Sequence, residues 1–188
     1  MALSSPVKRQ PLHTRELTMQ GYHREDGLLD IEGHLVDTKP FDIPNKDRGG
    51  VIKTGESLHE MRVRLTVNSD FEIVDAEAVT VWAPFDHCQG GTRSFRNLIG
   101  QTIGPGWNRR VKEIVGGTKG CTHITEMLAQ IATIVYQSFN SLESPGEPKS
   151  DGEGKPEILD TCFGLASNSP VVQREWPRYY RADDEAEV

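Results

Sequence analysis

The sequence predicts an α+β fold in which a mostly antiparallel sheet, built from hairpins, carries one long helix on one face. Two pairs of alternating apolar segments, each pair joined by a short polar turn, precede the helical segments rather than alternating with them. From Ile124 to Phe139, apolar residues then recur every three or four positions. This spacing is typical of an amphipathic helix that packs on a large apolar surface.

The N-terminal hairpin is predicted at residues 12–39, with its turn at Glu25-Asp26-Gly27. Its second strand places Leu29, Ile31 and Leu35 on one face, because successive strand side chains point to opposite sides. The other face carries three polar side chains, Asp30, Glu32 and His34. They form either a ladder of metal ligands or, as a simpler interpretation, a solvated sheet face.

The core of the fold is predicted at residues 55–142. A second hairpin over residues 61–82 turns at Asn68-Ser69-Asp70 and is expected at the centre of the sheet. Short helices follow near residues 94–100 and 107–115, and the long helix covers Thr122 to Ser141. The proline-containing segment 40–50 is expected to be a loop that crosses the domain.

The two ends of the chain add a linker and a second predicted hairpin. Residues 143–157 are rich in Gly, Pro, Ser, Glu and Lys, which is typical of a linker loop. Residues 158–188 are expected to form a terminal hairpin followed by a frayed acidic tail. The length of 188 residues favours a single domain over residues 1–188.

Composition narrows the classes of function and the cellular location. A formal net charge of −7 disfavours nucleic acid as the main partner, because binding phosphates requires a basic face. The chain has no apolar run of about 18 residues and no apolar centre of a signal peptide, so we expect no membrane association and a cytoplasmic location. The odd number of cysteines, 3, argues against a disulfide framework and leaves metal binding, reactivity or burial.

The start of the long helix carries a cysteine and a histidine. Gly117-Thr118-Lys119-Gly120 allows a tight turn before Cys121, and His123 follows on the first helical turn. Unpaired N–H groups at a helix start stabilise negative charge, so a thiolate at Cys121 is favoured there. The alternative is that Cys121 is buried as a small apolar residue.

Three residues at the ends of predicted elements, His59, Cys88 and Cys121, form the predicted metal site. Thiolates and imidazoles are the ligands that zinc or iron prefers, and either His123 or Cys162 would complete four ligands. The spacing is not that of a standard zinc finger, so the prediction depends on the fold bringing these residues together.

One resemblance rests on Gly55 to Leu65, the hairpin to Trp82, Cys88 and Gly120-Cys121-Thr122-His123-Ile124. In the order of these elements, residues 55–139 resemble the iron–sulfur scaffold proteins of the NifU and IscU type. It implies that His59 occupies the position of the scaffold aspartate ligand, and that Cys88 and Cys121 match two scaffold cysteines. The first scaffold cysteine has no counterpart near Ser57, and Gly120 replaces the histidine before the last cysteine. The resemblance therefore implies retained metal binding without sulfur transfer.

A closer resemblance, over the whole chain, is carried by the segments 26–33 and 55–61, by Pro105-Gly106-Trp107 and by Gly120-Cys121-Thr122-His123. In these segments the chain resembles a bacterial family known as domain of unknown function 2889. This resemblance implies a role in the catabolism of aromatic compounds, including lignin-derived units, and therefore a small aromatic substrate.

Two functions of different classes are consistent with these residues. The first is a metal-dependent carbon–carbon lyase that releases formaldehyde from a lignin-derived phenol, with His123 or Glu60 as acid or base. Arg62, Trp107 and Tyr22 are its candidate substrate-binding residues, although such side chains are more often solvated or in the core. The second is a metal or iron–sulfur carrier or accessory protein, and its simpler competitor is a purely structural zinc. The oligomeric state, including a homo-oligomer, remains open.

Overall fold

The computed structural model describes residues 3–143, 155, 156 and 158–182. The chain divides into two compact units, Met1–Ser138 and Phe139–Val188, whereas its length alone favours one domain. The predicted linker 143–157 lies almost wholly outside the described residues, as does the acidic tail from residue 183.

The first unit is built on a four-stranded antiparallel sheet, so the predicted α+β class is confirmed. Its strands are β1 (Thr14–His23), β2 (Leu29–Thr38), β5 (Ser57–Val67) and β6 (Ile73–Trp82), in the spatial order β1-β2-β5-β6. The second hairpin is therefore not central as a whole, because β6 is an edge strand. Each hairpin contributes one central strand, and β2 pairs with β5 along ten residues of register.

The two faces of the sheet differ in polarity, as strand alternation predicts. Odd-numbered residues of β2 and β5 are directed to the inner face, where Leu29, Ile31, Leu35, Met61 and Leu65 are all buried. Even-numbered residues of the same strands form the outer face, which is partly or fully exposed apart from the buried Thr66 at the end of β5. The inner face therefore belongs to the core, and any polar residue on it requires a partner.

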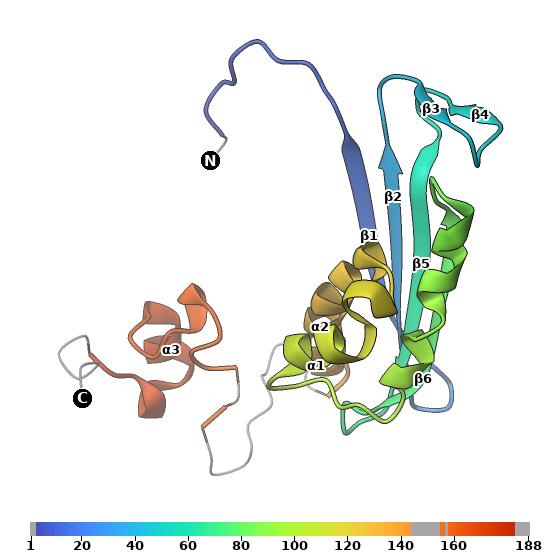
Figure 1. Ribbon diagram of the computed structural model, residues 1–188. Helices are drawn as coiled ribbons and strands as arrows, with labels where there is room; N and C mark the ends of the chain where they lie inside the picture. The colour runs from blue at the N-terminus through green and yellow to red at the C-terminus, as the bar shows by residue number, and fades with distance from the viewer. Residues whose placement is uncertain (1–2, 144–154, 157, 183–188) are drawn as a thin grey trace. The chain divides into compact units, whose positions relative to one another are not determined.

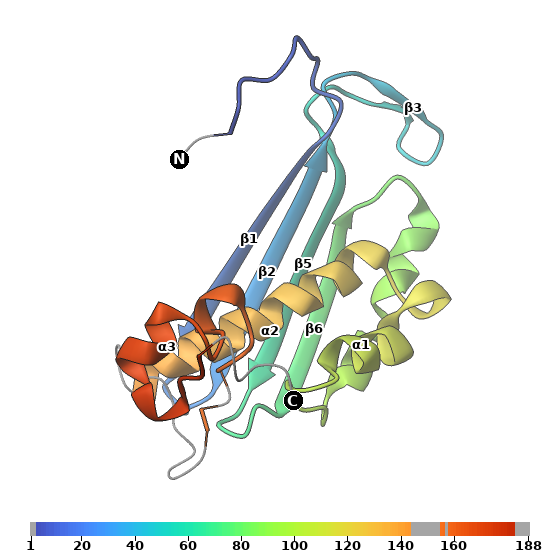
Figure 2. The same ribbon diagram turned by 90° about the vertical axis from the view of Figure 1, so that its left-hand side faces the viewer.

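Helices α1 (Trp107–Val115) and α2 (Thr122–Glu143) match the predicted helices closely. Figure 2 shows α2 crossing the face of the sheet, and Figure 1 shows α1 and α2 on the same side of it. The apolar stripe of α2 is buried, as its spacing predicts: Ile124, Met127, Leu128, Ile131, Val135 and Phe139. The Trp107 indole, which is 4% exposed, joins the two helices by donating to the Leu128 carbonyl at 2.9 Å.

Short elements connect the main strands and helices of the first unit. Within the loop after β2, β3 (Ile43–Asn45) and β4 (Gly50–Ile52) form a two-stranded ribbon. After β6, the chain forms two 3-10 segments, η1 (Asp86–Thr92) and η2 (Phe95–Leu98), and η3 (Gly117–Lys119) precedes α2. The segment η2 replaces the short helix expected at residues 94–100.

The second unit is helical in its described part, so the predicted C-terminal hairpin is wrong. It contains η4 (Phe163–Leu165), α3 (Pro170–Glu175) and η5 (Pro177–Tyr179). The Ser169 hydroxyl caps α3 by accepting from the Val172 N–H, and Pro170 occupies the first helical turn. Both are helix-start signals that outweigh the β-branched pair Val171-Val172. In the described residues, no helix is long and apolar enough to cross a membrane.

Candidate metal centre

The centre of the site is a carboxylate and an imidazole on neighbouring strands. Asp37 of β2 and His59 of β5 are register partners, and both lie on the inner face of the sheet. His59 Nδ1 lies 3.1 Å from Asp37 Oδ2. The Asp37 side chain is 1% exposed and the His59 side chain 17% exposed, so this polar pair lies at the border of the core.

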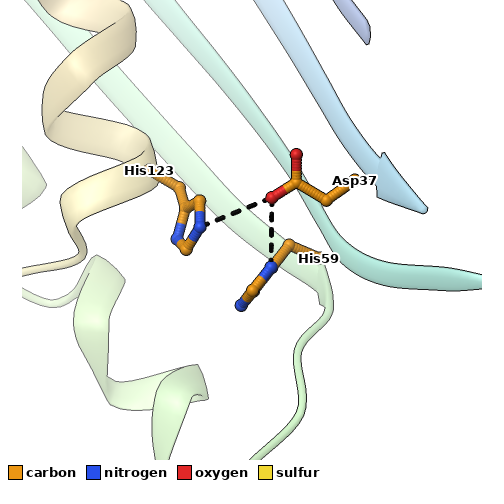
Figure 3. A group of neighbouring side chains, drawn as sticks. All are labelled: Asp37, His59 and His123. Atoms are coloured by element: carbon orange, nitrogen blue, oxygen red, sulfur yellow. Dashed lines mark hydrogen bonds and ion pairs between the residues drawn. The ribbon is translucent and has the colours of Figure 1, made fainter. Parts of the chain in front are cut away.

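A second histidine comes from the first turn of α2. His123 Nε2 lies 3.5 Å from the same Asp37 oxygen, and the rings of His59 and His123 lie 4.0 Å apart between their centroids. Figure 3 shows the two imidazoles converging on Asp37 from β5 and α2. One ligand atom from each of Asp37, His59 and His123 lies within 4.8 Å of the other two.

Arg15 of β1 holds the carboxylate in place. Its Nε donates to Asp37 Oδ1 at 2.7 Å and its Nη2 to Oδ2 at 2.8 Å, a bidentate geometry that fixes the plane of the carboxylate. His13 Nε2 lies 3.2 Å from Oδ1, and Glu126 of α2 accepts from Arg15 Nη1 at 2.8 Å. Oδ2, which also accepts from Arg15 Nη2, is the oxygen that faces the two imidazoles.

The surroundings of Asp37 keep it ionised. Burial alone would raise the pKa of this carboxyl group, but the hydrogen bonds and the charge of Arg15 outweigh burial and lower the pKa to about 2. The charges of His13 and His59 act in the same direction. Asp37 is therefore anionic throughout the physiological pH range.

The two imidazoles are shifted toward their neutral forms. Burial lowers the pKa of His59, and the neighbouring His123 lowers it further. Burial also lowers the pKa of His123, with the positive charge of Arg15 as the next cause. A metal ion binds neutral imidazole and ionised carboxylate, so both shifts favour coordination.

The donor set fits a divalent transition metal. Two histidines and one carboxylate leave further coordination positions open, which is typical of catalytic rather than closed structural sites. Arg15 and His13 occupy Oδ1 and one side of Oδ2, so the carboxylate would bind through a single oxygen and keep Arg15 as its orienting partner. Zinc and ferrous iron both accept such a set.

Close backbone packing positions the start of α2. A Cβ atom at Gly120 would lie 2.4 Å from the Val115 carbonyl oxygen, so this position requires glycine. The Cys121 carbonyl accepts from the Thr125 N–H at 2.9 Å and begins the helical hydrogen bonds. Cys121 Sγ then lies 3.7 Å from His123 Nδ1, on the side of the ring away from Asp37.

A hollow of about 1050 Å³ adjoins the cluster. It is lined by residues 86–91, 93, 94 and 118–123, so His123 belongs both to the hollow and to the metal cluster. Cys88 and Cys121 also line it and are half-buried. The hollow is large enough for a small organic molecule beside the metal ligands.

The structure brings together only part of the predicted metal site. His59 is in the cluster, but its partners there are Asp37 and His123 rather than the two cysteines. Cys88 and Cys121 lie together in the wall of the hollow, and the ligand set His59, Cys88 and Cys121 stays a prediction. Cys162 is exposed and belongs to the second unit.

The other predicted residues lie away from the cluster. Glu60 points to the outer face, where it pairs with His34 at 3.0 Å, because its neighbour His59 takes the inner face. Arg62 lies on the same outer face, paired with Glu60 at 3.4 Å. Trp107 is in the core, as its hydrogen bond to Leu128 shows, and Tyr22 is 43% exposed on β1.

The sequence carried a signal for Asp37 that the prediction missed. Asp37 continues the inner row of Leu29, Ile31 and Leu35 with the same spacing of two residues. A carboxylate in a buried row needs cationic or metal partners, which makes it a better candidate than Asp30 or Glu32 on the solvated face. His59 precedes Met61 and Val63 in the inner row of β5 in the same way.

Comparisons with known proteins connect this site to one family. No curated protein and no solved structure matches the chain, so no comparison bears on the resemblance to iron–sulfur scaffolds. A family model described as "Protein of unknown function (DUF2889)" matches residues 13–137, which include Arg15, Asp37, His59 and His123. Since the match covers the sheet, the cluster and most of α2, the chain belongs to the DUF2889 family.

Proposed function

We propose that this protein is a metal-dependent carbon–carbon lyase that acts on a small aromatic compound and releases a hydroxymethyl group as formaldehyde. The observation that carries the proposal is the convergence of Asp37, His59 and His123 at the edge of a hollow. A divalent metal held there supplies Lewis acidity to a substrate oxygen. The aromatic, lignin-derived substrate comes from the family resemblance rather than from the geometry.

The chain's own residues have separate tasks in this reaction. Asp37 and the two imidazoles hold the metal, and Arg15 and Glu126 orient Asp37. His123 is then a ligand, so the acid–base role predicted for it passes to Cys121, which lines the hollow and lies beside His123. Cys121 exchanges the proton of the substrate alcohol.

The bond changes balance without an added oxidant or reductant. The alcohol gives up its O–H proton, and its C–O bond becomes the C=O bond of formaldehyde as the C–C bond breaks. The released electron pair moves to the carbon beside the ring and delocalises into the ring. That carbon then takes up the proton, so a lyase needs only a proton acceptor, a Lewis acid and an enclosed site.

Two measurements test this function. Metal analysis of protein purified from its own host should find close to one zinc or iron per chain. Incubation with a panel of hydroxymethyl-bearing phenols should release formaldehyde, and Cys121→Ser should abolish release while the circular dichroism spectrum stays unchanged. Metal-loaded protein that releases no formaldehyde from any member of the panel would count against the lyase.

A carrier of metal or iron–sulfur clusters is the second candidate, and one observation favours it. Cys88 and Cys121 line an open hollow, where thiols are accessible to a partner protein. A carrier must release its cargo, so transfer of metal or cluster to an acceptor protein, lost in Cys88→Ser, would support the carrier and replace the lyase.

A further inference from the structure

The hollow beside the metal cluster has a charge opposite to that of the whole chain. The chain carries a formal net charge of −7. The lining of the hollow has two cationic side chains, Arg93 and Lys119, against one carboxylate, Asp86. Low-dielectric walls concentrate the field of such charges, so the lining of this hollow favours an anion.

Arg93 is the cation with no partner of its own. Among the residues that the structure describes, its guanidinium takes part in no hydrogen bond or ion pair. Three residues later, Arg96 pairs with Asp75 at 3.5 Å, and it does not line the hollow. The planar guanidinium of Arg93 is therefore available to bind a carboxylate through two parallel hydrogen bonds.

The other cation is held in position by the protein. Lys119 Nζ donates to the Glu113 carbonyl at 2.5 Å, which anchors it beside α1 and leaves two further N–H donors. The Lys119 carbonyl in turn accepts from the Ser94 hydroxyl at 2.6 Å, so the two walls of the hollow are joined directly. Arg93 and Lys119 thus come from two segments that are in contact in the wall of one hollow.

A different hollow, on the outer face of the sheet, can be compared with this one in the charge of its lining. It lies on the outer face, with a volume of about 410 Å³, and its walls include Arg62, Arg64, Glu32 and Glu77. There Arg64 is neutralised by Glu32 at 2.8 Å and by Glu77 at 3.2 Å. Because its charges are already paired, that hollow has no comparable preference for an anion.

We infer that the hollow beside His123 binds the carboxylate of an aromatic acid through Arg93, with Lys119 as the second cation. This inference rests on the proposed function for the identity of the site, and adds to it that the substrate is an anion. A carboxylate on Arg93 leaves the remainder of the molecule in the same hollow, whose lining also includes Cys121 and His123. Neutral phenols of the same size would bind more weakly.

The test uses the full chain, freed of metal with a chelator so that no carboxylate can bind a metal ion. 4-Hydroxybenzoate and the neutral 4-hydroxybenzyl alcohol are titrated separately, and binding is followed by the amide NMR signals of Gly91 and Cys121. We expect the acid to bind about tenfold more tightly than the alcohol, and Arg93→Gln to remove this preference. Arg96→Gln is the matched control and should keep it.

Each other outcome overturns the inference. A preference that survives Arg93→Gln, or that is lost equally in Arg96→Gln, would show that Arg93 does not hold the carboxylate. Inorganic phosphate that competes at lower concentration than 4-hydroxybenzoate would assign the hollow to phosphate instead. The measurement needs neither metal nor turnover, so His59→Gln, which removes a proposed metal ligand, should leave the preference intact even if the lyase proposal fails.

Discussion

Asp37 and His59 face each other across the two central strands, with His59 Nδ1 3.1 Å from Asp37 Oδ2 on the buried side of the sheet. Their separation is fixed by the hydrogen bonds of the β2–β5 ladder rather than by a loop. Side chains on such elements are held in position in advance, so a metal bound there would cost the site little conformational freedom.

The first prediction concerns metal affinity. His59→Gln should weaken zinc binding, measured by competition with a chromophoric chelator, by at least about tenfold, because one of three protein ligands is lost. His34→Gln is the matched control, since His34 also pairs with a carboxylate, Glu60 at 3.0 Å, on the outer face of the same strands. Equal affinities for the two variants would exclude His59 as a ligand.

The second prediction concerns Arg15. Arg15→Met leaves the buried Asp37 carboxylate without its bidentate partner, so the free energy of unfolding in urea should fall by about 2–3 kcal/mol without metal. Arg64→Met, which breaks the exposed pairs with Glu32 and Glu77, should cost less than about 1 kcal/mol.

Zinc should restore part of the stability of Arg15→Met. A ligand that binds only the folded chain adds about 2.7 kcal/mol at one hundred times its dissociation constant. If zinc stabilises Arg15→Met less than it stabilises the unaltered protein, Arg15 would be needed to present Asp37 to the metal.

The third prediction follows from the lowered pKa of Asp37. That pKa is about 2 in the folded protein against an ordinary value of 3.8, so the stabilisation it brings is complete above pH 3.8 and is lost as the pH falls through 2. The difference in unfolding free energy between the unaltered protein and Asp37→Asn should therefore shrink by about 2 kcal/mol from pH 5 to pH 2. A difference that is constant over this range would mean that Asp37 titrates normally.

The sequence predicted the fold better than the site because the two depend on different information. Strand alternation and helical spacing located β1, β2, β5, β6, α1 and α2, since each pattern is local. The pairing of β2 with β5 is not local, and it was the step needed to place Asp37 opposite His59. Without that register, Asp30, Glu32 and His34 are also candidate metal ligands, although they lie on the solvated face.

There is a physical reason why the sequence favours the cysteines over Asp37. Thiolates are strong zinc and iron ligands, so Cys88 and Cys121 outweighed a single aspartate in a sequence-based ranking. In the structure both cysteines line the hollow next to the cluster of Asp37, His59 and His123. The order of residues along the chain does not distinguish a residue of the cluster from a residue of the neighbouring hollow. The buried carboxylate and its arginine carried the more specific signal, because an ionised side chain in a core row must be paired.

The last prediction concerns the turn that positions Cys121 and His123. Gly120→Ala would place a Cβ atom 2.4 Å from the Val115 carbonyl oxygen, closer than real side chains approach. The clash is with backbone, so α2 must shift relative to α1, at a cost of about 1–3 kcal/mol in the free energy of unfolding. The shift should also weaken zinc binding, because His123 is three residues away on the same helix start.

Gly164→Ala, where no atom lies within 4 Å of the new Cβ, is the control and should change stability by less than about 0.5 kcal/mol. Thermal unfolding and zinc titration of both variants check the two effects, and unchanged zinc affinity in a destabilised Gly120→Ala would mean that the cluster does not depend on this turn.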